Sequence, residues 1–184
     1  MSYRDLIVYV GSQELTYLGD NPPKPASMKE SPERVLEYFE ASTGHDWTFK
    51  NALTQSWCGH FVYWVLSQAE VEPIPSPGGK TIGRFMFSQG GLYPAYSVSS
   101  GDYEPQAGDL YYQRFVNGKE THHIGIIMEV YDDEIVTIDG NSGPDSGAGF
   151  YLDPVNWKPR LGSGMIYSRS KKKSNLTSYI QMPD

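Results

Sequence analysis

The chain has 184 residues, 39% of them hydrophobic and 20% charged, with a formal net charge of -7 and a single cysteine. This size and apolar content are typical of one domain with its own core rather than a disordered chain, and the acidic excess disfavours a nucleic-acid-binding protein. One cysteine excludes an internal disulfide and a zinc site built from several thiolates, and we expect no metal or other cofactor.

No stretch of the chain approaches the ~20 consecutive apolar residues of a membrane-spanning helix. The N-terminus lacks the basic region, apolar stretch and cleavage site of a Sec-type signal peptide, so we expect synthesis in the cytoplasm without a Sec signal. We expect one domain, residues 1–184, with its core at about 30–169 and an N-terminal helix and loop at 1–25. The basic run at 169–173 leads into residues 170–184, which we expect to form a solvated tail.

Three helices are predicted in the first part of the chain. Apolar residues recur at helical spacing over residues 5–15. The second helix is predicted at 32–44, where Ser31 is a suitable N-cap and Gly44 a suitable stop. A longer and more apolar helix begins near residue 57 and ends before the proline-rich segment that follows.

The second half of the chain has the pattern of antiparallel strands. The segment at 72–105 is rich in Gly, Pro, Ser and Tyr and predicts a functional surface loop, with one short helix near 82–87. Alternating apolar residues separated by turn residues then predict strands at 109–115, 123–130, 135–139 and 164–169. Helices followed by an antiparallel sheet predict an α+β domain.

The only thiol of the chain, Cys58, lies where the third helix is expected to begin. Unpaired N–H groups and the helix dipole lower the pKa of a thiol in this position and favour the nucleophilic thiolate. The same N–H groups can stabilise an oxyanion. The alternative is an ordinary buried cysteine, which is a common fate of this residue type.

Histidines supply the candidates for a base beside this thiol. His60 lies two positions past Cys58 and therefore points to a different face of the helix. His122 and His123 open the strand at 123–130, and because side chains alternate along a strand only one of them can face Cys58. The alternative for each is a polar residue at the edge of a strand.

A catalytic imidazole is usually oriented by a third polar group that accepts its other N–H. Asp139 and Asn141 end the strand that follows the histidine strand, although Asp-Gly-Asn is also an ordinary turn sequence. A carboxylate stabilises an imidazolium and is costly in an apolar strand without a partner, whereas turn formation explains Asn141. We therefore expect Asp139 to orient the imidazole and Asn141 to be a secondary contact.

Four segments in this order resemble the CHAP family of cysteine, histidine-dependent amidohydrolases and peptidases, a relative of NlpC-type enzymes: residues 57–65 (WCGHFVYWV), 105–110 (PQAGDL), 123–127 (HIGII) and 137–141 (TIDGN). They are similar to the family's nucleophile helix, its Pro-x-x-Gly-Asp entry into the first strand, its His-Val-Gly strand and its Ile-Glu-Gly-Asn segment. The resemblance implies a papain-like α+β fold, with N-terminal helices packed on an antiparallel sheet.

The resemblance also implies roles for individual residues. Cys58 is the nucleophile and His123 the general base, while Asp139 and Asn141 occupy the positions of the family's acid and asparagine. The implied reaction is amide hydrolysis through a thioester.

Residues next to the nucleophile complete the expected site. The backbone N–H of Cys58 and the side chain of Gln55 are candidates for the oxyanion hole. Trp57 and His60 are candidates for substrate binding. The mechanism needs no metal, and no metal-ligand spacing is present.

The resemblance implies peptidoglycan or a muropeptide as substrate, cut in the stem peptide, in a cross-bridge or at the sugar–peptide amide. Such an enzyme acts at the cell wall or periplasm, reached by non-Sec export or lysis. It is expected as a phage-type lysin or an injected antibacterial effector with a cognate immunity or secretion partner. The alternatives are an NlpC-type cysteine peptidase acting on another amide and a non-catalytic binding or immunity module on the same fold.

Overall fold

The computed structural model describes residues 1–20, 24–53, 55–72, 93–116, 119–142, 151–152, 159–160 and 164–184, and the fold is described for these residues. The short helix expected near 82–87, and most of the loop that contains it, lie outside the described residues.

The described residues form four α-helices, which are α1 (Tyr3–Gln13), α2 (Pro32–Thr43), α3 (Phe49–Ala52) and α4 (Cys58–Gln68). They also form the short 3-10 helices η1 (Glu14–Thr16), η2 (Val98–Ser100) and η3 (Lys173–Asn175). Helix α2 begins at the expected proline and ends at Gly44, whose φ of 69° suits glycine. The expected N-cap Ser31 instead hydrogen-bonds the backbone of Ser27. Within the described ranges, no helix is long and apolar enough to cross a membrane.

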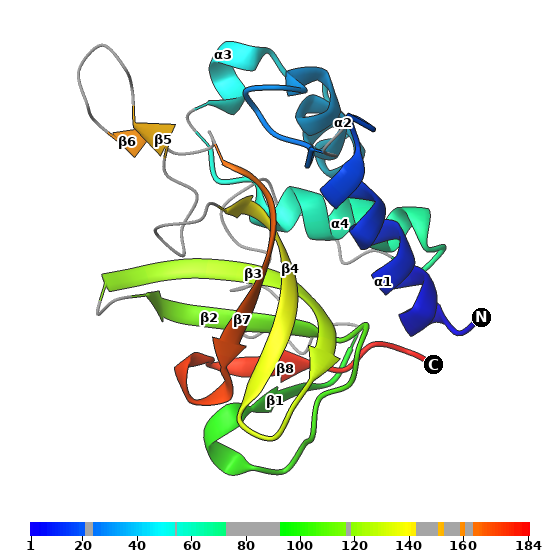
Figure 1. The fold of residues 1–184 in the computed structure, drawn as a ribbon, viewed down its shortest axis with the longest axis vertical. Coiled ribbons are helices and arrows are strands. Elements are labelled where there is room, and N and C mark those ends of the chain that lie inside the picture. Colours follow the sequence, from blue (N-terminus) through cyan, green and yellow to red (C-terminus); the bar gives the residue numbers. More distant parts are fainter. Residues whose placement is uncertain are drawn as a thin grey trace.

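The main sheet has six strands in the order β1-β8-β2-β3-β4-β7, and every neighbouring pair is antiparallel. The strands are β1 (Ala95–Ser97), β2 (Leu110–Val116), β3 (Lys119–Val130), β4 (Glu134–Ser142), β7 (Met165–Lys172) and β8 (Ser178–Ile180). Strands β5 (Tyr151–Leu152) and β6 (Pro159–Arg160) form a separate pair. The α-helices α1 to α4 lie along one side of the sheet (Figure 1), which confirms the predicted α+β class.

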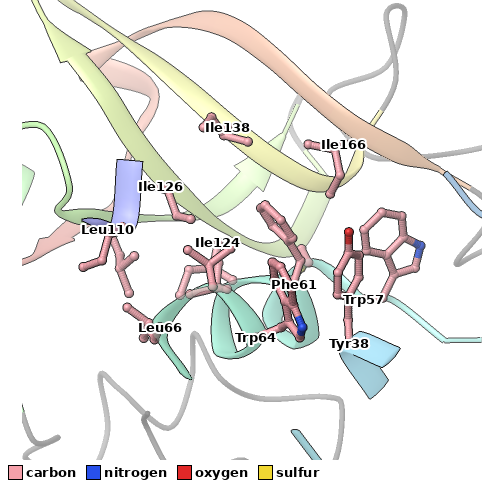
Figure 2. Close-up of a cluster of buried hydrophobic side chains, with 14 of the residues drawn as sticks. Tyr38, Trp57, Phe61, Trp64, Leu66, Leu110, Ile124, Ile126, Ile138 and Ile166 are labelled. Carbon is pink, nitrogen blue, oxygen red and sulfur yellow. The ribbon is translucent and has the colours of Figure 1, made fainter. Parts of the chain in front are cut away.

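The main hydrophobic core lies between the helices and the sheet. Phe61 of α4 packs in this core with Ile124 of β3 and Ile138 of β4, and Figure 2 shows these side chains converging from both layers. Because residues alternate along a strand, the intervening residues point to the opposite face, which we call the inner face. A smaller cluster covers part of it and contains Tyr111, Ile127, Ile135, Leu176 and Tyr179.

The sheet is strongly curled around this inner face. Strands β2 and β7 are separated by β3 and β4 in the sheet order. Yet Lys171 Nζ of β7 lies 3.5 Å from Gln113 Oε1 of β2 and 5.2 Å from the ring centroid of Tyr111. In a flat sheet these strands would be about 14 Å apart, at ~4.8 Å for each step between neighbours. Polar side chains from non-adjacent strands therefore meet on the inner face.

The C-terminal segment is part of the fold, so the expectation of a solvated tail at 170–184 is wrong. Strand β7 continues to Lys172, and β8 is inserted between β1 and β2. Ile180 and Met182 are buried in the main core, while Leu176 packs on the inner face. These apolar residues retain the segment because their burial removes hydrophobic surface from water.

A buried carboxylate, Asp109, joins the two ends of the chain to the start of β2. Its side chain accepts hydrogen bonds from Arg4 Nε (3.1 Å), the Tyr103 hydroxyl (2.6 Å) and the backbone N–H groups of Gln106 (2.8 Å) and Met182 (2.9 Å). Arg4 belongs to α1, and Met182 follows β8. The aspartate of the predicted Pro-x-x-Gly-Asp segment therefore has a structural role, because it links α1 and the C-terminal segment to the start of β2.

We expect Asp109→Asn to lower the free energy of unfolding by about 3 kcal/mol, because it removes the buried anionic partner of Arg4 and leaves only the exposed Asp184. Urea denaturation measures the change. The matched control is Asp102→Asn, which removes the same charge from an exposed neighbouring position. Equal stabilities of the two variants would contradict the structural role of Asp109.

Candidate active site

Cys58 is the first residue of α4 and is almost fully buried. Helix α4 presents the unpaired N–H groups of its first turn at this end. The preceding residue, Trp57, is buried against Tyr38, with ring centroids 5.8 Å apart, and so anchors the entry into the helix. The thiol is therefore held at a helix N-terminus, as the sequence predicted.

The thiol of Cys58 hydrogen-bonds the imidazole of His123 in β3. The Ser56 hydroxyl lies 3.5 Å from Sγ, and the backbone N–H of Ile124 also bonds the sulfur. Burial opposes ionisation of the thiol, but the bond to His123, its positive charge, and the bonds from Ser56 and Ile124 together lower the pKa of Cys58 to about 7.

Asp139 of β4 contacts the imidazole of His123 and occupies the position of the third residue of a catalytic triad. Its Oδ1 is 3.4 Å from His123 Nε2, which is the separation of an ion pair rather than a short hydrogen bond. Burial disfavours a charged imidazole, but Asp139 and the Cys58 thiolate raise the pKa of His123 to about 9. Between these two pKa values the site holds a thiolate–imidazolium pair.

A glycine in β3 makes room for this carboxylate. Gly125 is paired with Tyr111 of β2 and lies beside Asp139 of β4. A Cβ atom at Gly125 would lie 2.2 Å from Asp139 Oδ1 and 2.7 Å from Tyr111 Cε1. Because position 125 has no side chain, the carboxylate extends over β3, where it meets both His123 and the Tyr111 hydroxyl.

The second oxygen of Asp139 is held from β4 and β7. Oδ2 accepts a hydrogen bond from Thr137 Oγ1 at 3.1 Å and lies 3.5 Å from Lys171 Nζ and 3.6 Å from Arg169 Nε. Burial alone would raise the pKa of this fully buried acid, but the charges of Lys171 and His123 and the hydrogen bonds to the carboxylate hold it well below its usual range.

Asn141 lies on the nucleophile's side of the site. Its φ of 56° is in the left-handed region, which asparagine tolerates better than most residues. Its Nδ2 donates to the Ser56 hydroxyl at 3.1 Å, and its Oδ1 accepts from the backbone N–H of Gly164 at 3.4 Å. The structure thus places Asp139 at the imidazole and connects Asn141 to Cys58 through Ser56.

The neighbouring histidine is directed elsewhere. His122 is half-buried, its Nδ1 hydrogen-bonds the Tyr112 hydroxyl, and its ring is stacked on that tyrosine. This arrangement follows the alternation predicted for the start of the strand, where only His123 faces the cysteine.

Trp57 and His60 are wrong as substrate-binding residues, because both side chains are fully buried among the helices. The His60 ring lies 4.2 Å from that of Phe39, and its Nδ1 hydrogen-bonds the Ser42 hydroxyl. Burial lowers the pKa of His60 to about 4. Helical geometry turns this residue toward α2, so it packs in the core rather than at the thiol.

The remaining expected residue, Gln55, is half-buried in the turn that leads to Cys58, and its backbone N–H bonds the carbonyl of Ala52. Its role in the oxyanion hole stays a prediction. Among the described residues, no group of three or more His, Cys, Asp or Glu side chains is placed to hold a metal ion.

Sequence reasoning missed the side chains that surround Asp139 and Cys58: Ser56, Tyr111, Thr137, Arg169 and Lys171. The alternation of side chains along a strand could have indicated two of these residues. Arg169 and Lys171 share one face of β7, while Lys172 is exposed on the other.

Comparison with known families matches the CHAP domain to residues 49–141, which is half of the chain and contains Cys58, His123, Asp139 and Asn141. The chain therefore belongs to the CHAP family, as the sequence motifs predicted. CHAP domains are generally amidohydrolases or peptidases, and the family suggests peptidoglycan as the substrate. Neither a curated protein nor a solved structure matches the chain.

We expect Gly125→Ala to lower kcat/KM about a hundredfold, because the new methyl group displaces the Asp139 carboxylate from His123. The matched control is Gly11→Ala in α1, where the methyl group would meet only the flexible end of Ile138 at 3.2 Å and the end of Ile126 at 3.5 Å. Steady-state kinetics on both folded variants measures the effect. Wild-type activity in Gly125→Ala would show that the close approach of Asp139 is not required.

Proposed function

We propose that this protein is a cysteine amidase or peptidase that hydrolyses an amide bond of peptidoglycan. One observation carries the proposal: Cys58, His123 and Asp139 are in contact in that order, and the pKa of the thiol lies below that of the imidazole. A thiol arranged in this way is ionised at neutral pH and is therefore a ready nucleophile.

The reaction follows from this charge arrangement. The Cys58 thiolate attacks the carbonyl carbon of the amide, and the resulting oxyanion is held by N–H groups at the start of α4, with Gln55 as the second donor. His123 gives its proton to the leaving amine, and a thioester remains on Cys58. His123 then accepts a proton from water, which hydrolyses the thioester and restores the thiolate.

Membership of the CHAP family supports peptidoglycan as the substrate, and the proposal places the site of action at the cell wall. The candidate bonds lie in the stem peptide, in a cross-bridge and at the sugar–peptide amide. The alternative of a non-catalytic module is less well supported, because such a module would not need an ionised cysteine beside a buried imidazole–carboxylate pair.

The proposal is tested by digesting purified peptidoglycan and identifying the released fragments by mass spectrometry. We expect defined fragments with the wild-type protein and almost none with Cys58→Ala or His123→Ala, and the double variant should be barely worse than either single one. The position of the new carboxyl and amino groups identifies the bond that is cut.

The matched control is His122→Ala, which should keep most of the activity because His122 is bonded to Tyr112 rather than to the cysteine. Turnover by folded Cys58→Ala would overturn the cysteine mechanism. Loss of activity in His122→Ala with retention in His123→Ala would exchange the roles of the two histidines.

A further prediction ranks the two polar residues at the end of β4. Asp139→Asn should lower kcat tenfold or more, because an amide cannot stabilise the imidazolium. Asn141→Ala should cost less, because Asn141 reaches the thiol only through Ser56. Kinetics on variants with unchanged thermal unfolding gives the ranking. The reverse order would assign the orienting role to the amide of Asn141.

A further inference from the structure

The inner face of the sheet holds a buried lysine that the reaction does not use directly. Lys171 belongs to β7, and only 8% of its side chain is exposed. Its Nζ lies 3.5 Å from Asp139 Oδ2, 3.5 Å from Gln113 Oε1 and 5.2 Å above the ring of Tyr111. The adjacent Lys172 is exposed, as expected when side chains alternate along a strand.

The two oxygens of Asp139 have different partners. Oδ1 faces His123 and the Tyr111 hydroxyl, whereas Oδ2 faces Lys171 Nζ and Arg169 Nε. Arg169 is itself fixed, because its Nη2 donates to the Ser142 hydroxyl at 2.6 Å. The two cations therefore hold one edge of the carboxylate and leave the other edge directed at the imidazole.

The charges of this cluster do not balance. With the thiolate–imidazolium pair formed, the anions are Cys58 and Asp139, and the cations are His123, Lys171 and Arg169. The Tyr111 hydroxyl and the Gln113 amide, which face the cluster from β2, are neutral, and burial together with Asp139 raises the pKa of Tyr111 well above its usual value. His123 neutralises Asp139, and the Cys58 thiolate offsets only one of the two charges of Lys171 and Arg169, so one positive charge is in excess.

An excess positive charge in a buried site acts on every proton equilibrium nearby. Water and salt screen it poorly there, and it favours the deprotonated form of both the thiol and the imidazole. Its removal should therefore raise the pKa of Cys58 and the pKa of His123 in the same direction. A side chain with only a packing role would not produce this parallel shift.

We propose that Lys171, assisted by Arg169, is a positioning residue that holds the Asp139 carboxylate against His123 and supplies the positive charge that favours the thiolate of Cys58. The proposal rests on the proposed function, because it assigns Lys171 a role in the same site. It also predicts that Lys171 determines the pH range in which the nucleophile is ionised.

The test measures the rate of Cys58 alkylation by iodoacetamide as a function of pH, in the wild-type protein and in Lys171→Met. Iodoacetamide is uncharged and Cys58 is the only cysteine, so the rate reports the thiolate fraction directly. We expect the wild-type midpoint near pH 7. We expect Lys171→Met to move it upward by about one pH unit, the order of effect of one buried charge that is separated from the thiol by a carboxylate and an imidazole.

Lys172→Met is the matched control, because it removes the same charge from the exposed side of the same strand. Its midpoint should stay at the wild-type value. Lys171→Arg should have a midpoint close to that of the wild type, because it keeps the positive charge. In the pH profile of kcat/KM, both limbs should move upward together in Lys171→Met. If that variant does not fold, Arg169→Gln should shift the midpoint in the same direction.

A folded Lys171→Met whose alkylation midpoint equals that of the wild type overturns this inference and leaves the proposed function intact. The same holds if Lys171→Met does not fold and the Arg169→Gln profile is unchanged. A wild-type protein that is alkylated only above about pH 8.5, the range of an ordinary thiol, contradicts the proposed function itself. The two failures are therefore distinguishable in one set of measurements.

Discussion

Asp139 carries a negative charge where water cannot reach it, and much of the structure can be understood from the need to stabilise that charge. A buried carboxylate without partners would take up a proton and could then no longer stabilise the imidazolium of His123. Its partners come from β2, β3, β4 and β7, strands that can share one buried group only because the sheet is curled. Because Gly125 has no side chain, the Asp139 carboxylate has the space to extend across β3 to His123.

The nucleophile reaches this cluster from the other layer of the fold. Helix α4 packs on the opposite face of the sheet, and its first residue lies at the end where β4 approaches most closely. A Cβ at Gly140 would lie 2.6 Å from Cβ of Phe61, so helix and strand are nearly in backbone contact there. This close packing brings Asn141 within reach of Ser56 and allows one site to draw on both layers.

The sequence predicted the parts of the site that are defined by short local motifs. Cys58 at a helix start and His123 at a strand start lie in short motifs, and alternation correctly separated His123 from His122. The cations at Asp139 were missed because a run of basic residues indicates solvent exposure, and only the curl of the sheet brings Lys171 inside. Strand β8 was missed because three residues are too few to show a period of two. Trp57 and His60 were misassigned because proximity in sequence to a nucleophile does not determine which face of a helix a side chain occupies.

The hydrogen bonds of Asp109 determine where a second protein module could be attached to this domain. Arg4 and Met182 bind the same carboxylate, so both ends of the chain emerge from one corner of the molecule. In Figure 1 that corner lies across the domain from the start of α4, where Cys58 is located. A second module fused at either end, or a surface linkage through either end, would therefore attach away from the end of α4 that carries Cys58.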